Sequence, residues 1–197
     1  MIKRIFTDPS FIFLIAINVY CIWYYQNNPD QFFTLVFLYW GQSLLIGIFN
    51  FADLLTLKSS IWGSVKDPSI ANSPAKGCTA AFFALHYGMF HFVYGIFILV
   101  QAKLTIDFRF VLLGLAAFSL NLLLQFIRQK QWEQENIVNA ATIFFLPYLR
   151  IIPMHLMLIG PAFLHWQPSI IFLVLKAFAD ATMYLATSPV YKPGKAG

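Results

Sequence analysis

Six long apolar runs, separated by shorter polar stretches, follow one another along the chain. A helix needs about 20 mostly apolar residues to cross the hydrocarbon core of a bilayer, and each run is close to that length. The stretches between the runs are too short to hold a soluble domain. We therefore predict an all-α fold with a single transmembrane domain over residues 1–197. Its six helices are expected at about residues 10–25, 32–57, 79–101, 108–127, 136–164 and 169–187.

Composition agrees with a polytopic membrane protein. Of the 197 residues, 59% are hydrophobic and 11% are charged, and the mean hydropathy is +0.69, whereas soluble domains carry roughly a quarter charged residues. The net charge is +5, but the basic residues are scattered among loop ends and form no nucleic-acid-binding motif. Nucleic acid is therefore not an expected partner. The expected partners are the lipid bilayer and either another membrane protein or a second copy of the chain.

The distribution of Lys and Arg predicts the orientation of the helices. With the N-terminus inside, nine of these residues fall in cytoplasmic segments, whereas only Lys103 and Arg109 fall in outer ones. Basic residues concentrate on the cytoplasmic side of membrane proteins. We therefore predict that both termini face the cytoplasm and that the protein is a multi-pass protein of the cytoplasmic membrane.

Two histidines stand inside the third apolar run, FFALHYGMFHFVY, residues 82–94. Ionisable side chains are rare within a membrane and mark functional sites or structural contacts. His86 and His91 are five residues apart, so on a regular helix with about 3.6 residues per turn their imidazoles point about 140° apart. We expect them to contact different neighbours.

Charged residues inside the last two runs should pair with one another. An isolated charge at the bilayer centre costs roughly 2.5 kcal/mol, so Asp180 is expected to pair with Lys176 one helical turn away, with Arg150, or with both. A structural ion pair is favoured, and the alternative is that Arg150 and Lys176 hold an anionic head group. The expected depths place the polar residues in two layers, Gln42, His91, Arg150 and Asp180 in one, and Asn50, Asp53, His86 and Tyr184 nearer the cytoplasm.

A metal site is an alternative interpretation of the histidines. His86 and His155 together with Asp180 could hold zinc, with Asp180 as a ligand or as the catalytic base of a hydrolase acting on a membrane substrate. The simpler interpretation is that the histidines form hydrogen bonds between helices. The chain has no HExxH, CxxCH, Walker or GxSxG motif. Haem is therefore not expected, and enzymatic activity is left open.

Four motifs span the second to sixth predicted helices: YWGQSLLIGIFNF (39–51), HYGMFHFVYG (86–95), PYLRIIPMH (147–155) and LKAFADATMY (175–184). They resemble an uncharacterised family of bacterial and archaeal integral membrane proteins, catalogued as a domain of unknown function. This resemblance implies a prokaryotic protein. The resemblance implies a shared polar core and no particular activity. The polar positions of the family pattern are matched here by Gln42, Asn50, His86, Arg150, His155, Lys176 and Asp180.

Three functions are compatible with the sequence. The favoured hypothesis is a non-enzymatic accessory or assembly subunit of a membrane complex, whose buried polar cluster joins helices. One alternative is an intramembrane zinc hydrolase that uses His86, His155 and Asp180. A second alternative is a small anion transporter, for which Arg150 and Lys176 would attract the anion.

Overall fold

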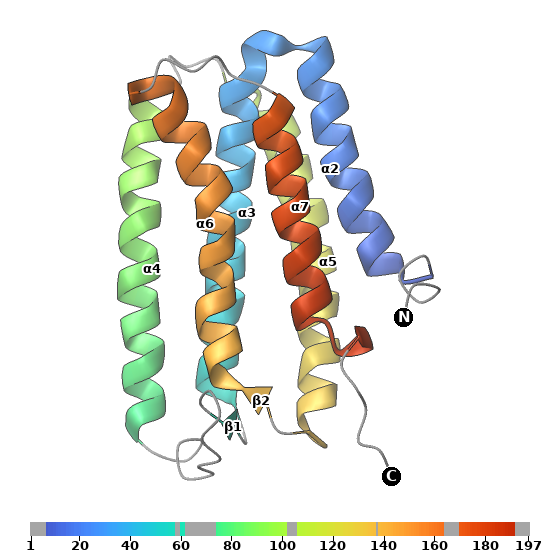
Figure 1. Ribbon diagram of the computed structural model, residues 1–197, viewed down its shortest axis with the longest axis vertical. Helices are drawn as coiled ribbons and strands as arrows, with labels where there is room; N and C mark the ends of the chain where they lie inside the picture. Colours follow the sequence, from blue (N-terminus) through green and yellow to red (C-terminus); the bar gives the residue numbers. More distant parts are fainter. Residues whose placement is uncertain are drawn as a thin grey trace.

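Figure 1 shows the computed structural model, which describes residues 7–57, 60–61, 74–101, 106–136, 138–163 and 170–191. In these residues six long helices stand side by side. Each runs antiparallel to the one before it. We call the end of the bundle where α3, α5 and α7 finish the lower end, as it is drawn in Figure 1. The helices are α2 (Pro9–Asn27), α3 (Phe32–Thr56), α4 (Pro74–Gln101), α5 (Phe108–Glu133), α6 (Ala140–Phe163) and α7 (Ile170–Thr187).

Short elements complete the described part of the chain. Two 3-10 turns, η1 (Pro29–Gln31) and η3 (Pro189–Tyr191), lie between α2 and α3 and after α7. Strands β1 (Ser60–Ile61) and β2 (Val138–Asn139) pair in parallel at the lower end. The fold is therefore helical apart from this one pair of two-residue strands in the described residues.

The six predicted helices are confirmed, and each is long and apolar enough to cross a membrane. Their ends differ from the prediction by four residues or more in three places. The third helix begins at Pro74 instead of about residue 79, and proline is favoured in the first turn of a helix. The fourth helix continues to Glu133 through residues predicted to be a loop, because Arg, Gln, Lys and Glu are good helix formers and can extend a helix beyond its apolar part. The fifth helix begins at Ala140, because Val138 and Asn139 pair with β1 instead.

Helix α3 is the centre of the bundle. It packs against α4, α5 and α6, while α7 packs against α2 and α6. Its side chains Thr34, Leu35 and Val36 have no exposed surface. The polar side chains of Gln42, Ser43 and Asp53 on α3 are buried as well, so they meet other helices instead of the outer surface.

The outer surfaces of α4 and α5 are strongly apolar. Leu85 and Val100 on α4 are each 76% exposed, and Leu112 and Leu113 on α5 are 71% and 72% exposed. Soluble proteins rarely expose large contiguous apolar areas. These surfaces are suited to contact with lipid chains.

Candidate functional site

A group of polar side chains is buried near the middle of the helices. Asp180 on α7 is 1% exposed, and each of its carboxylate oxygens faces a cation. Its Oδ1 lies 2.9 Å from Arg150 Nε on α6, and its Oδ2 lies 2.6 Å from Lys176 Nζ one turn earlier on α7. The predicted pairing of Asp180 is confirmed, in the form that includes both Arg150 and Lys176.

Lys176 is held by partners from two further helices. Its Nζ donates hydrogen bonds to Gln42 Oε1 on α3 at 2.8 Å and to Asn18 Oδ1 on α2 at 3.2 Å, and it lies 4.0 Å from the centre of the Tyr39 ring. Asn18 Nδ2 in turn donates to Asp180 Oδ2 at 3.3 Å. We call Asn18, Gln42, Arg150, Lys176 and Asp180 the Asp180 cluster.

Arg150 is the least satisfied member of the Asp180 cluster. Its Nε is close to the Asp180 carboxylate but donates no hydrogen bond to it, and in the described part of the chain Arg150 has no other hydrogen bond. Its guanidinium carbon lies 6.0 Å from the centre of the Phe118 ring. Arg150 therefore has N–H groups available for a further partner.

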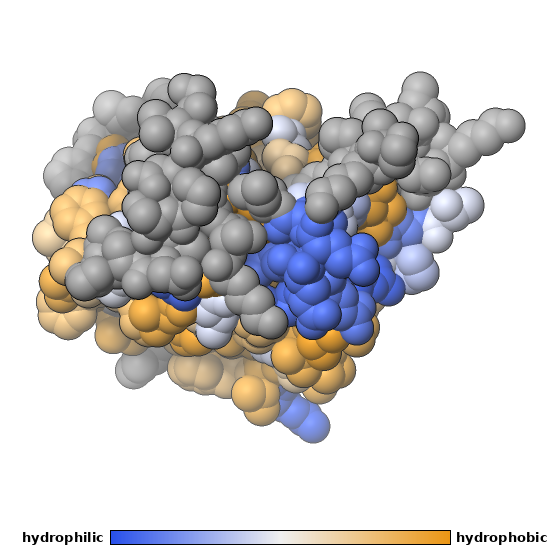
Figure 2. Space-filling view, turned by 90° about the horizontal axis from the view of Figure 1, so that it is seen from below, coloured by the Kyte–Doolittle hydropathy of each residue, from blue (hydrophilic) through white to orange (hydrophobic). Residues whose placement is uncertain are grey.

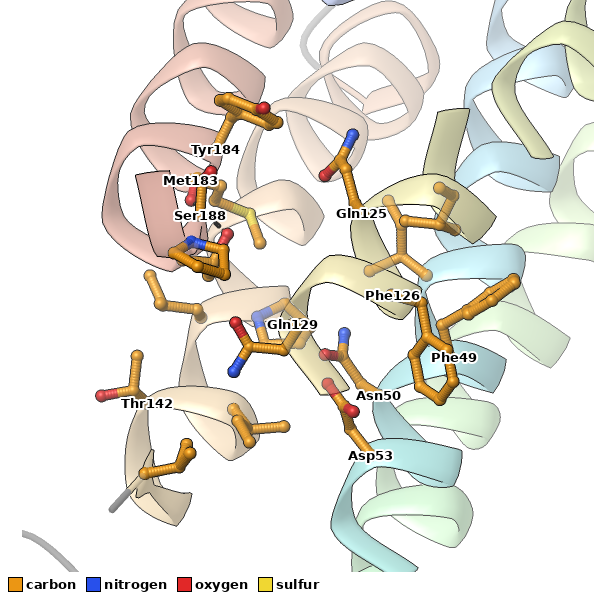
Figure 3. Close-up of a pocket in the computed structure, with 18 of the residues that line it drawn as sticks. Phe49, Asn50, Asp53, Gln125, Phe126, Gln129, Thr142, Met183, Tyr184 and Ser188 are labelled. Atoms are coloured by element: carbon orange, nitrogen blue, oxygen red, sulfur yellow. Dashed lines mark hydrogen bonds between the residues drawn. The ribbon is translucent and has the colours of Figure 1, made fainter. Parts of the chain in front are cut away.

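A pocket of about 560 Å³ extends from Arg150 toward the lower end of the bundle, between α3, α5, α6 and α7. Asn50 and Asp53 from α3 lie next to each other on one side of it (Figure 3), Gln129 lines it from α5, and Tyr184 near the end of α7 lines it on another side. Much of the remaining wall is apolar, including Ile46, Phe49, Leu122, Phe126, Leu146 and Met183. Small-molecule sites have this size and this mixture of apolar walls and few polar groups.

Charged side chains surround the lower end of this pocket. Seen from below, hydrophilic residues gather beside the apolar sides of the bundle (Figure 2). Lys130 on α5 lies 2.7 Å from the carboxylate of Asp53 and 2.8 Å from that of Glu133. These ion pairs join α3 to the polar last turns of α5. They place charge at one end of the pocket, while Arg150 places charge at the other.

Ion pairing and hydrogen bonding also fix the wall that α7 contributes. Tyr184 donates a hydrogen bond of 2.6 Å to Asp8 Oδ2, and Arg128 on α5 lies 3.7 Å from Asp8 Oδ1. Arg128 also donates to Ser10 Oγ at 3.2 Å. The beginning of α2 is thereby tied to α5 and α7 beside the pocket.

Each of the three described histidines has its own partner. His86 Nδ1 lies 2.9 Å from the Tyr148 hydroxyl, and His155 Nδ1 forms a hydrogen bond with the Tyr94 hydroxyl; both pairs join α4 to α6. His91 Nδ1 donates to the backbone oxygen of Tyr87 on its own helix at 2.9 Å. The prediction that His86 and His91 contact different neighbours is confirmed.

The structure separates the residues predicted to bind zinc. His86 and His155 pair with tyrosines between α4 and α6, whereas Asp180 pairs with Arg150 and Lys176. Within the described residues, no three His, Cys, Asp or Glu side chains are grouped closely enough to hold a metal ion. Zinc binding by His86, His155 and Asp180 stays a prediction.

Within each of the two predicted polar layers, some of the residues come together in the structure. Gln42, Arg150 and Asp180 meet, as expected from their depth, and Lys176 joins them. Asn50, Asp53 and Tyr184 line the pocket. The histidines of both layers have other partners: His86 bonds to Tyr148 of α6, and His91 bonds to the backbone of its own helix.

Comparison with known sequences identifies the family of the chain. Residues 2–191 match a family of unknown function (DUF6498). The chain belongs to this family. The match covers nearly the whole chain and confirms the predicted membership of an uncharacterised family. No curated protein and no solved structure matches it.

Two features of this DUF6498 protein were not predicted from its sequence. Asn18 completes the Asp180 cluster, and its only signal is that it interrupts the apolar stretch FLIAINVYC of α2. Gln125 and Gln129 line the pocket from α5. They stand four residues apart, on one side of that helix. This spacing is the signal from which their position on the same wall of a pocket could have been predicted.

Proposed function

We propose that this DUF6498 protein is a multi-pass membrane protein that binds a small amphipathic molecule in the pocket between α3, α5, α6 and α7. The observation that carries the proposal is the pocket of about 560 Å³ that ends at Arg150. Its volume is within the range of about 300–1,000 Å³ that small-molecule sites occupy. Packing alone does not require a cavity of this size, because protein interiors are close-packed.

The lining of the pocket supports a ligand with an apolar body and a hydrogen-bond-accepting group. Arg150 has no hydrogen-bond partner among the described residues, so its N–H groups can bind an acceptor at the inner end. The amides of Asn50 and Gln125 can both donate and accept. Phe49 and Phe126 offer apolar surface to the rest of the ligand.

Six apolar helices and the distribution of basic residues support the membrane orientation. The lower end carries Lys76, Arg128 and Lys130, whereas Arg109 is the described basic residue at the upper end. The positive-inside rule then assigns the lower end to the cytoplasm. In this orientation the ligand enters the pocket from the cytoplasmic side of the membrane, and both termini face the cytoplasm.

Filling the pocket should displace its ligand. Leu146→Trp adds a large side chain to the wall contributed by α6. We expect mass spectrometry of organic extracts of the purified protein to detect a co-purifying small molecule in the wild type and at least tenfold less of it in Leu146→Trp.

Leu149→Trp is the matched control. Leu149 stands on the same helix and is 42% exposed, and it lines neither this pocket nor the smaller cavity beside Asp180. It should retain the small molecule at the wild-type level. The proposal is overturned if the wild type carries no small molecule beyond detergent and bulk lipid, or if both variants carry equal amounts.

The functions predicted from sequence use this pocket differently. A small anion transporter would need the pocket to open alternately to both sides of the membrane, and an accessory subunit would present it within a larger complex. A zinc hydrolase would need His86, His155 and Asp180 to share one metal ion. Elemental mass spectrometry of the wild type beside His86→Ala tests the hydrolase, and all three functions stay predictions.

A further inference from the structure

A second cavity, of about 20 Å³, lies between α3, α6 and α7. Gln42, Arg150, Lys176 and Asp180 of the Asp180 cluster contribute to its wall, together with Met154 and other apolar residues. A cavity needs roughly 10–15 Å³ to hold one water molecule. This one therefore has room for a single water-sized species and none for an organic group.

Two buried nitrogen atoms on the wall have no hydrogen-bond partner in the described part of the chain, Gln42 Nε2 and Arg150 Nε. Gln42 is 2% exposed, and its Oε1 accepts a hydrogen bond from Lys176, which identifies the other end of the amide as the NH₂ group. Buried donors are nearly always paired. Both atoms can only donate, so their partner has to be an acceptor.

The charges around the cavity do not balance. Arg150 and Lys176 contribute two positive charges, and Asp180 contributes one negative charge. Across the described residues, no other carboxylate is within ion-pairing distance of either cation. Asp180 also lines the cavity, but each of its oxygens already faces a cation. A buried charge without a counter-charge is unfavourable, which favours an anion over a water molecule.

We propose that this cavity binds one small inorganic anion of the halide type, with chloride as the species of that size and charge available in cells. The anion accepts hydrogen bonds from Gln42 Nε2 and Arg150 Nε and balances the charge of the Asp180 cluster. This halide site is separate from the larger pocket, although Arg150 contributes to both walls. It does not require a ligand in the larger pocket.

Thermal unfolding of the detergent-purified protein tests the halide site. Sodium chloride or sodium bromide replaces sodium gluconate at constant total salt, since gluconate is too large for the cavity. We expect a saturable increase in Tm of about 5 °C in either halide. In Gln42→Glu the new carboxylate supplies the negative charge beside Arg150 and Lys176, so the Tm should no longer depend on halide.

Gln125→Glu is the matched control, because Gln125 lines the larger pocket but not the smaller cavity; it should keep the full halide response. Equilibrium binding of radioactive chloride to the wild type should reach one ion per chain, a measurement that stands even if Gln42→Glu does not fold. The proposal is overturned if the wild type binds no chloride and its Tm is equal in chloride and gluconate. A full halide response in Gln42→Glu would overturn it as well.

Discussion

Asp180 shows how one side chain can hold several helices together. Its carboxylate lies beside Arg150 of α6 and Lys176 of α7, and it accepts a hydrogen bond from Asn18 of α2. Ion pairs of this kind depend on every partner, because the removal of one leaves the others buried without compensation. A substitution of Asp180 is therefore expected to destabilise the contacts of the whole Asp180 cluster.

Asp180→Asn removes the negative charge and keeps the shape of the side chain. Two buried cations then lack a carboxylate, and we expect a loss of about 3–5 kcal/mol in the free energy of unfolding. Denaturant unfolding in detergent micelles measures it. Asp30→Asn serves as the control, since Asp30 is exposed and its replacement should change stability by less than about 0.5 kcal/mol. Equal, small effects of the two substitutions would show that the cluster does not stabilise the fold.

At the level of single residues, the partners of charged side chains were easier to predict than the partners of neutral polar ones. Lys176 and Asp180 are four residues apart, so one helical turn brings them together, and the cost of burying an unpaired charge made their pairing predictable. Asn18 is neutral, and nothing in its apolar surroundings identifies a partner. The tyrosines bonded to His86 and His155 could not be named either, because those contacts depend on how α4 and α6 are rotated toward each other.

Contact between α3 and α4 depends on a glycine. A Cβ atom built on Gly47 would lie 2.6 Å from Cε1 of Tyr87. The Tyr87 ring has little freedom to move away, because its hydroxyl is hydrogen-bonded to Ser43 and the residue is 3% exposed. The absence of a side chain at Gly47 therefore lets the two helices pack closely.

Gly47→Ala should weaken this contact by overpacking. We expect a loss of about 1–3 kcal/mol in the free energy of unfolding, measured in the same micelle assay. Gly88→Ala on α4 is the matched control, because a Cβ atom there would meet nothing within 4 Å. Alanine is favoured over glycine within a helix by about 0.5–1 kcal/mol, so this variant should be as stable as the wild type or more so. A neutral Gly47→Ala would contradict the close packing of α3 and α4.

Apolar length predicted the helices well, but not their polar extensions. The run from Phe108 to Ile127 identified α5, while its last turns up to Glu133 carry further side chains of the pocket wall. Hydropathy has no signal for a helix that continues into a polar environment. The sequence therefore predicted the part of α5 that contributes Leu122, Gln125 and Phe126 to the pocket and missed the turns that contribute Arg128, Gln129 and Trp132.

The pocket itself is a property of the whole molecule. It exists because α5 makes few contacts with α6 and α7 in the described residues, while α3 contacts both α5 and α6. Residues from four helices line it, and no sequence spacing relates them. Individual members such as Asn50, Asp53 and Tyr184 could be chosen from the sequence as polar residues of apolar helices. That these residues line one cavity could be seen only in the three-dimensional structure.

The orientation of the whole molecule can be tested with its own cysteines. Cys78 is exposed near the beginning of α4 at the lower end, and Cys21 is 1% exposed within the bundle. If the lower end faces the cytoplasm, a membrane-impermeant maleimide should label Cys78 in inverted membrane vesicles and leave it unlabelled in intact spheroplasts of a bacterial host. Cys78→Ser should abolish the labelling, because Cys21 is inaccessible. Labelling of Cys78 in intact spheroplasts would reverse the orientation and would place the entrance of the pocket on the outer side of the membrane.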